Sequence, residues 1–180
     1  MKLNNNYNII LYFILSIFLS CKSVNHTNNK SIFLLNENSY SPKDANFFVK
    51  VIQNKSVTIQ KDKFDKSFIT FEENKSSTVL KFSYTPHKID GIADAEYREE
   101  VYLTIKNNHK EVILSDQSLS DVNAIFGRLC FCRESSGYFP VEKGKLEITK
   151  TKNKAYKLEF TFKIHELPQK LKSISATIVF

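Results

Sequence analysis

The chain has 180 residues and a formal net charge of +7 at pH 7, from 26 Lys and Arg against 19 Asp and Glu. Its lysines are scattered along the sequence without a run of five like charges, which is typical of a solvated surface and excludes a nucleic-acid-binding protein. The length suits one domain with a substantial core, and the positive charge favours an anionic lipid or polysaccharide surface.

Residues 1–20 have the pattern of a cleaved signal peptide. A polar leader with one lysine, MKLNNNYN, precedes an apolar run of 11 residues, Ile9–Leu19. A helix that crosses a membrane needs about 20 apolar residues, so this run is too short to span a bilayer and fits the hydrophobic region of a secretory signal. We expect cleavage before Cys21.

The residues at the expected cleavage site carry a resemblance. Phe18-Leu19-Ser20-Cys21 resembles the lipobox of bacterial lipoproteins, in which a small residue precedes a cysteine that becomes lipidated. The composition, rich in Asn, Lys and Ile with four Gly and no Trp, is similar to that of Bacteroidota proteins. The resemblance implies a stable anchor of several acyl chains on Cys21, membrane lipid as a partner, and a place in the cell envelope, at the outer membrane of a Gram-negative bacterium. It covers about twenty residues and implies no activity.

A polar segment follows the predicted lipidation site. The sequence KSVNHTNNK, residues 22–30, has no apolar period, so residues 21–30 are predicted to be a tether between the lipid and the domain. We expect a single domain over residues 31–180.

Apolar residues alternate with polar ones from about residue 45 onward. In KLEFTFKI, residues 157–164, the apolar side chains fall on one face and the polar ones on the other, and EVYLTIK, residues 100–106, repeats the pattern. Less regular runs occupy residues 46–52, 56–60, 67–72, 78–84, 111–114, 123–132, 145–150 and 172–180. The links NK, NNH, EKGK and KNK suit hairpins. The sequence predicts an all-β domain of roughly 8–10 antiparallel strands, either a β-sandwich or a small β-barrel.

The stretch GRLCFCRESSGY, residues 127–138, contains Cys130 and Cys132 between Arg128 and Arg133. In a strand the two cysteines share a face with Cα atoms about 6.5–7 Å apart, so a disulfide would need a bulge or a turn. Three interpretations stay open: structural cysteines packed in the sheet as thiols or as a strained disulfide, a metal site, or a redox-active thiol whose pKa an arginine lowers. A metal site would need further ligands from the histidines, none of which stands in a spaced motif: His26, His87, His109 and His165.

Two other stretches are candidate sites. Asp90, Asp94 and Glu96 do not have the spacing of a calcium-binding loop, so they are expected to lie in a solvated loop. The run SSGYFP, residues 135–140, lacks a nucleophile elbow, but Tyr138, with Arg128 or Arg133, is predicted to form a sugar or peptide contact. No residue is predicted to be catalytic, and no metal or other cofactor is predicted.

These observations favour a non-enzymatic binding or envelope-assembly module, held in the cell envelope by a lipid, with an envelope protein or glycan as its partner. The alternative is a thiol-based metal-binding or redox accessory protein that works through Cys130 and Cys132. A hydrolase built on a β-sandwich ranks third.

Overall fold

Nine strands and one 3-10 helix make up the part of the chain that the computed structural model describes, residues 45–87, 97–108, 111–132, 135–152, 155–165 and 167–179. The strands are β1 (Ala45–Lys61), β2 (Ser67–Pro86), β3 (Arg98–Lys106), β4 (Val112–Ser115), β5 (Ile125–Leu129), β6 (Gly137–Pro140), β7 (Lys143–Lys150), β8 (Tyr156–Lys163) and β9 (Ser173–Ile178). The helix η1 (Asp116–Val122) separates β4 from β5.

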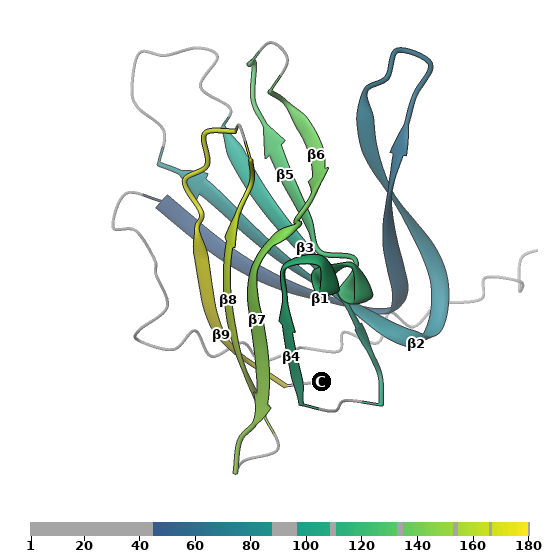
Figure 1. Ribbon diagram of the computed structural model, residues 1–180, viewed down its shortest axis with the longest axis vertical. Coiled ribbons are helices and arrows are strands. Elements are labelled where there is room, and N and C mark those ends of the chain that lie inside the picture. Colours follow the sequence, from purple (N-terminus) through teal and green to yellow (C-terminus); the bar gives the residue numbers. More distant parts are fainter. Residues whose placement is uncertain are drawn as a thin grey trace, which may run out of the picture. The chain divides into compact units, whose positions relative to one another are not determined.

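The strands form two antiparallel sheets. One has the order β1-β2-β3-β5-β6 and the other the order β4-β7-β8-β9, and Figure 1 shows the two sheets as separate layers. Buried side chains from both sheets fill the space between them; they include Leu80, Phe82, Val101, Leu103, Phe126, Leu146, Leu158, Phe160, Phe162 and Ile174. The all-β prediction is therefore confirmed, and the fold is the sandwich rather than the small barrel.

The structure differs from the prediction in the lengths of two strands and in what the expected hairpin links connect. The predicted strands 46–52 and 56–60 are parts of β1, and 67–72 and 78–84 are parts of β2. The link NNH leads from a strand of one sheet to a strand of the other. In EKGK only Glu142 lies in the link between the sheets, because β7 begins at Lys143. KNK lies between the paired strands β7 and β8. Two of the expected hairpin links are therefore crossings between layers, which local turn chemistry does not distinguish from hairpins.

A large bulge bends the hairpin formed by β1 and β2. Pairing stops at Gln53 and resumes at Lys55, so that residues 74–77 of β2 stand opposite the single residue Asn54. Asn54 has a φ of 57°, a left-handed conformation that asparagine tolerates better than most residues. The predicted turn at Asn54-Lys55 is thus a bulge, and we call the hairpin beyond it, residues 55–73, the arm.

Side chains on neighbouring strands fix this bulge. Asn107, after the end of β3, accepts a hydrogen bond from Thr78 Oγ1 at 2.8 Å and donates one from Nδ2 to the Lys75 carbonyl at 2.9 Å. Ser77 Oγ donates to the Lys55 carbonyl at 2.8 Å. The bend is held by polar contacts that only tertiary structure brings together.

The arm covers the outer face of the five-stranded sheet. A second apolar cluster lies there, made of Val57, Val79, Tyr102 and Ile125 with Ile52, Ile59, Ile69 and Tyr138 packed against them. As a result β3 is buried on both faces, whereas its alternating pattern predicts burial on one. All described residues belong to one compact unit.

Candidate functional site

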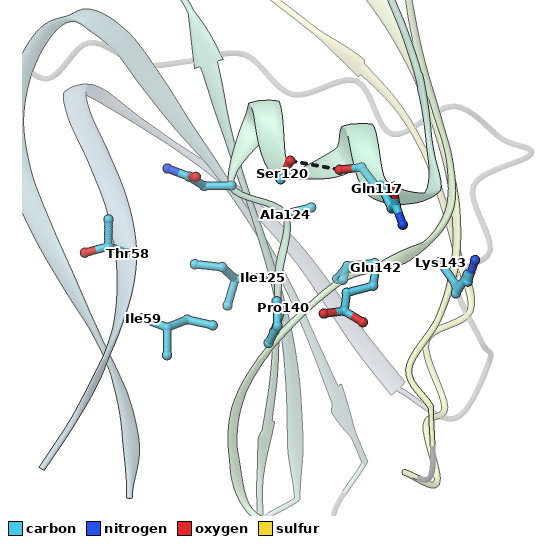
Figure 2. A pocket seen from close by; sticks show the side chains of 11 residues that line it. Thr58, Ile59, Gln117, Ser120, Ala124, Ile125, Pro140, Glu142 and Lys143 are labelled. Atoms are coloured by element: carbon cyan, nitrogen blue, oxygen red, sulfur yellow. Dashed lines mark hydrogen bonds between the residues drawn. The ribbon is translucent and has the colours of Figure 1, made fainter. Parts of the chain in front are cut away.

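A pocket of about 480 Å³ opens between the arm, η1 and the link from β6 to β7. Figure 2 shows Thr58 and Ile59 of the arm on one side of it, with Glu142 and Lys143 on the other. The volume lies within the range of about 300–1,000 Å³ that is usual for small-molecule sites. This pocket is the candidate site of the domain.

The arm side of the pocket is held at two points. Asn123 Nδ2, at the end of η1, donates to the Val57 carbonyl at 3.4 Å, and the Tyr138 amide donates to Ser67 Oγ at 2.7 Å. Gly137 lets Ser67 approach, because a Cβ at Gly137 would lie 2.6 Å from the serine oxygen. The arm is therefore a fixed wall in this structure.

The helix η1 supplies the upper rim in Figure 2. Ser118 Oγ accepts a hydrogen bond from the Ser115 amide at 2.8 Å and donates one to the Ser115 carbonyl at 2.7 Å, which holds the first turn. Leu119 and Val122 are buried in the core, so Gln117 and Ser120 face outward at the pocket. Seven residues are too few for a helical hydrophobic period, which is why the sequence does not predict this element.

The pocket is lined by both apolar and polar residues. The apolar ones are Ile59, Ala124, Ile125, Pro140 and Val141, and the polar ones are Thr58, Gln117, Ser120, Asn123, Glu142 and Lys143. Such a lining suits a ligand with an apolar body and a few hydrogen-bonding groups. Hydrolysis of a glycosidic bond generally takes two carboxyl groups, and covalent catalysis takes a nucleophile beside a base. Glu142 is the one carboxylate among the lining residues, which include neither histidine nor cysteine.

A buried polar network stands on the same outer face of the sheet. The Glu100 carboxylate is 2.6 Å from Lys81 Nζ and 3.0 Å from Arg98 Nε, and it accepts hydrogen bonds from the hydroxyls of Tyr102 at 2.5 Å and Tyr138 at 3.4 Å. Glu100 is 2% exposed. Four donors therefore satisfy a carboxylate that the arm and the sheet enclose, so its role is to stabilise their packing.

The tyrosines of this domain that contact buried carboxylates resist ionisation. Burial, followed by the hydrogen bond to Glu99, raises the pKa of Tyr97 to about 12. Burial also raises the pKa of Tyr102, and the hydrogen bond to Glu100 adds to the shift. The pKa of Tyr138 is raised by burial and then by the charge of Glu100. All three phenols act as hydrogen-bond donors, and none is prepared to act as a base.

Glu99 links the two layers from the opposite face of β3. It is fully buried and accepts the amides of Lys170 at 2.7 Å and Leu171 at 2.6 Å, together with the Tyr97 hydroxyl. These amides precede β9 of the other sheet. The sequence analysis missed both Glu99 and Glu100, because charged residues at the start of a strand ordinarily indicate solvent.

Cys130 and Cys132 form a disulfide, with Cα atoms 5.2 Å apart. The prediction of a strand through residue 132 is wrong, because β5 ends at Leu129 and the chain turns there, which brings the Cα atoms closer than a strand allows. Both cysteines are half-buried at the end of the sheet and not packed within it. In this oxidised state neither sulfur is a thiolate, so the thiol-based function stays a prediction for a reduced form.

The predicted ligand contacts do not share a surface. Arg128 is buried on the face toward the other sheet, over the Tyr97 ring, and its Nη1 donates to the Ser135 carbonyl at 3.2 Å. Tyr138 lies on the outer face, where its ring would meet a Cβ at Gly127 at 2.7 Å. Arg128 thus ties the end of β5 to the segment before β6, and a contact of either residue with a ligand stays a prediction.

Several predicted site residues lie outside the described ranges: Cys21, His26, Asp90, Asp94, Glu96, His109 and Arg133. His87 is exposed after β2, and His165 follows β8. Within the described residues there is no cluster of three or more His, Cys, Asp or Glu side chains that could hold a metal ion.

The chain matches no protein-family model, and neither the curated proteins nor the solved structures include one that matches it. Over the described ranges, no helix has the length and apolar character that a transmembrane span requires. The function must therefore be argued from the site itself.

Proposed function

We propose that this chain is a non-enzymatic binding module of the bacterial cell envelope, anchored to a membrane by a lipid on Cys21. The pocket beside the arm holds its ligand. The observation that carries the proposal is the lining of this pocket, which combines apolar side chains, hydrogen-bonding side chains and a single carboxylate, Glu142. A lining of this kind recognises an amphipathic ligand, and it holds no second carboxylate, histidine or cysteine that could act with Glu142.

The ligand that fits has an apolar face of limited size. Ile59, Ile125 and Val141 would contact that face, while the amides of Gln117 and Asn123 would pair with its polar groups. An envelope glycan fragment, a short peptide and a medium-chain acyl group each combine these features. They are the three classes to be tested.

The binding half of the proposal is tested by methyl NMR on the full chain, with one representative of each ligand class as the probe. We expect one class to shift the methyl signals of Ile59, Ile125 and Val141 and to leave those of Leu158, in the core between the sheets, unchanged. Ser120→Tyr places a ring at the exposed edge of the pocket and should abolish the shifts, whereas Asp121→Tyr, at the next position of η1, which is also exposed but does not line the pocket, should preserve them. Methyl shifts that persist in the Ser120→Tyr chain would contradict binding in this pocket. The absence of methyl shifts with all three ligand classes would contradict it as well.

The anchor half rests on the apolar run Ile9–Leu19 and on Ser20-Cys21. Cells that express the chain are fed a clickable fatty acid, and the protein is then examined for the label. We expect label on the natural chain and none on Cys21→Ala, with both found at similar abundance. Equal labelling of the two would contradict the anchor and leave the pocket untouched.

A further inference from the structure

Two hairpin ends of the five-stranded sheet expose phenylalanine side chains. Phe64, in the turn of the arm, is 70% exposed, and Phe131, between the two bridged cysteines, is 89% exposed. Phe68, just after the turn of the arm, is also exposed. Single exposed apolar residues are ordinary, but several on neighbouring loops mark an interaction surface.

The turn that carries Phe64 is fixed by its own hydrogen bonds. Asp62 Oδ1 accepts the amide of Phe64 at 2.8 Å and that of Lys66 at 2.9 Å, and Lys61 Nζ pairs with Asp65 Oδ1 at 2.8 Å. Both aspartates are thus engaged within the turn. The aromatic ring is held outward by a hydrogen-bonded backbone.

The bridged segment that carries Phe131 is closed in a comparable way. The disulfide between Cys130 and Cys132 flanks Phe131, and the Cys130 amide donates to Ser136 Oγ at 3.4 Å. Buried Arg128 adds the bond to the Ser135 carbonyl. This cross-link keeps Phe131 on the outside, because its two neighbours are tied to each other.

The two ends are neighbours. The turn of the arm leads into Ser67, the link after the bridged cysteines leads into Gly137 and Tyr138, and the Tyr138 amide bonds Ser67 Oγ at 2.7 Å. Figure 1 shows both hairpins ending at the top of the view. Phe64 and Phe131 therefore project from adjacent hairpin ends of one sheet.

The turn that carries Phe64 has an excess of basic residues. Lys63 and Lys66 stand in it, and Lys63 Nζ lies 4.9 Å from the centre of the Phe64 ring. Lys61 is paired with Asp65, so residues 61–66 carry three lysines against two aspartates. The whole chain has a charge of +7. Aromatic rings flanked by lysines are the combination that enters the interface of an anionic membrane, where the rings lie among the acyl chains and the ammonium groups meet the headgroups.

We propose that the two hairpin ends dock on an anionic bilayer, with Phe64 and Phe131 inserted at the level of the headgroups. Exposed aromatic rings on two turns suit a fluid surface, which needs no matching shape, better than a folded protein, whose interface requires shape complementarity. This docking does not depend on the lipid at Cys21, since it uses contacts of the domain itself.

The chain has no tryptophan, so a single substitution creates an unambiguous fluorescent reporter. Phe131→Trp and Phe64→Trp report on the two ends, and Phe48→Trp, at a position of β1 that is 63% exposed outside the arm, is the matched control. The full chain is mixed with vesicles of phosphatidylglycerol and phosphatidylethanolamine, or of phosphatidylcholine alone. Emission wavelength and quenching by brominated acyl chains are measured.

On the anionic vesicles we expect the emission of the Phe131→Trp and Phe64→Trp chains to shift to shorter wavelength and to be quenched. The emission of the Phe48→Trp chain should stay unchanged. When Phe131→Ser is added to the Phe64→Trp chain, the affinity for anionic vesicles, measured by the single indole, should fall roughly tenfold. A change of this size is expected when one aromatic side chain no longer enters the membrane.

Unshifted emission from both end reporters on both kinds of vesicle, or shifts equal to that of the Phe48→Trp control, would overturn the proposal. Equal shifts on neutral and anionic vesicles would overturn its charge selectivity. A chain held only through its N-terminus would sediment with the vesicles and leave the indole of the Phe131→Trp chain in water. Failure of the docking and failure of the anchor are therefore distinguishable.

Discussion

Glu99 and Glu100 are consecutive residues of β3 whose buried side chains lie on opposite faces of the sheet. Glu100 is paired with two cations and two phenols, whereas Glu99 accepts two backbone amides and one phenol without a cation within salt-bridge distance among the described residues. A carboxylate can be buried in either way, provided that its oxygens are satisfied. Each glutamate joins β3 to a different partner: Glu100 to the outer cluster and Glu99 to the opposite layer.

Glu99→Gln should test the second of these links. The amide keeps the shape of the side chain but turns one acceptor into a donor, which then faces a donor from Lys170, Leu171 or Tyr97. We expect the free energy of unfolding to fall by about 2–3 kcal/mol. Urea denaturation measures it, with Glu72→Gln, at an exposed position of β2, as the control. Equal, small effects of both substitutions would contradict the role of Glu99.

The raised pKa values of Tyr97, Tyr102 and Tyr138 predict a loss of stability at high pH. In the unfolded chain a phenol ionises near pH 10, whereas in the folded protein Tyr97 ionises near pH 12. The stability that these phenols contribute is therefore complete below about pH 10 and is lost as the pH rises through the folded values. Absorbance of the phenolate should show a group of tyrosines that ionises only together with unfolding, as followed by circular dichroism. If every tyrosine of the protein titrates near pH 10 while the protein stays folded, the burial of these phenols is wrong.

Single residues of this kind were beyond prediction from the sequence. Glu99 and Glu100 stand in the segment REE, which looks like a solvated strand end, and their partners are up to 72 residues away. The cysteines were recognised, but their bridge depends on a turn after Leu129 that the alternation of apolar residues does not reveal. Burial of a polar side chain follows from what packs on it, which is a tertiary property.

At the level of elements, the arm is the feature that turns an ordinary sandwich into one with a pocket. The bulge at Asn54 and residues 74–77 redirects two long strands, and Asn107 holds the bulge from β3. The sequence predicts strands at nearly the right residues, but it predicts β1 and β2 as two strands each. A polar Asn-Lys pair is compatible with either a turn or a bulge, so the pattern does not distinguish the two.

Asn107→Ala should loosen the arm without unfolding the sandwich. The substitution removes the acceptor for Thr78 Oγ1 and the donor to the Lys75 carbonyl. We expect amides of residues 55–73 to exchange with solvent roughly tenfold faster, while those of β7 and β8 are unchanged. Asn46→Ala, on an exposed position of β1, is the control. Faster exchange throughout both sheets would show that the arm is not a separate unit.

The disulfide predicts a modest contribution to stability. The ring between Cys130 and Cys132 spans three residues and constrains the unfolded chain little, so replacing both cysteines by serine should cost about 1.5 kcal/mol. Both side chains are half-buried, which limits any additional loss from packing. Thermal unfolding measures the change, and intact mass after thiol trapping measures the bridge. Two thiols that are trapped rapidly in the native protein would contradict the bridge and revive the thiol-based alternative.

At the level of the whole molecule, alternation of apolar and polar residues was enough to predict an all-β domain but left the β-sandwich and the small β-barrel open. The alternation predicts burial correctly for most strands, because they have one face in the core, as β8 and β9 show. It does not predict the burial of β3 on both faces, since the arm covers the second face, nor does it identify the links that cross between sheets. The pocket is built by three segments distant in sequence, so no local pattern could have indicated it.

The central claim is that the pocket beside the arm binds its ligand without altering it. The most direct measurement is to incubate the full chain with the ligand class identified by NMR and to weigh the recovered ligand by mass spectrometry, alongside the binding stoichiometry. We expect one ligand for each chain, recovered with unchanged mass, and equal recovery with Glu142→Gln, since the lining holds no second carboxylate, histidine or cysteine to act with Glu142. Conversion of more than one ligand for each chain, abolished by Glu142→Gln, would contradict the claim and show that the pocket is an active site.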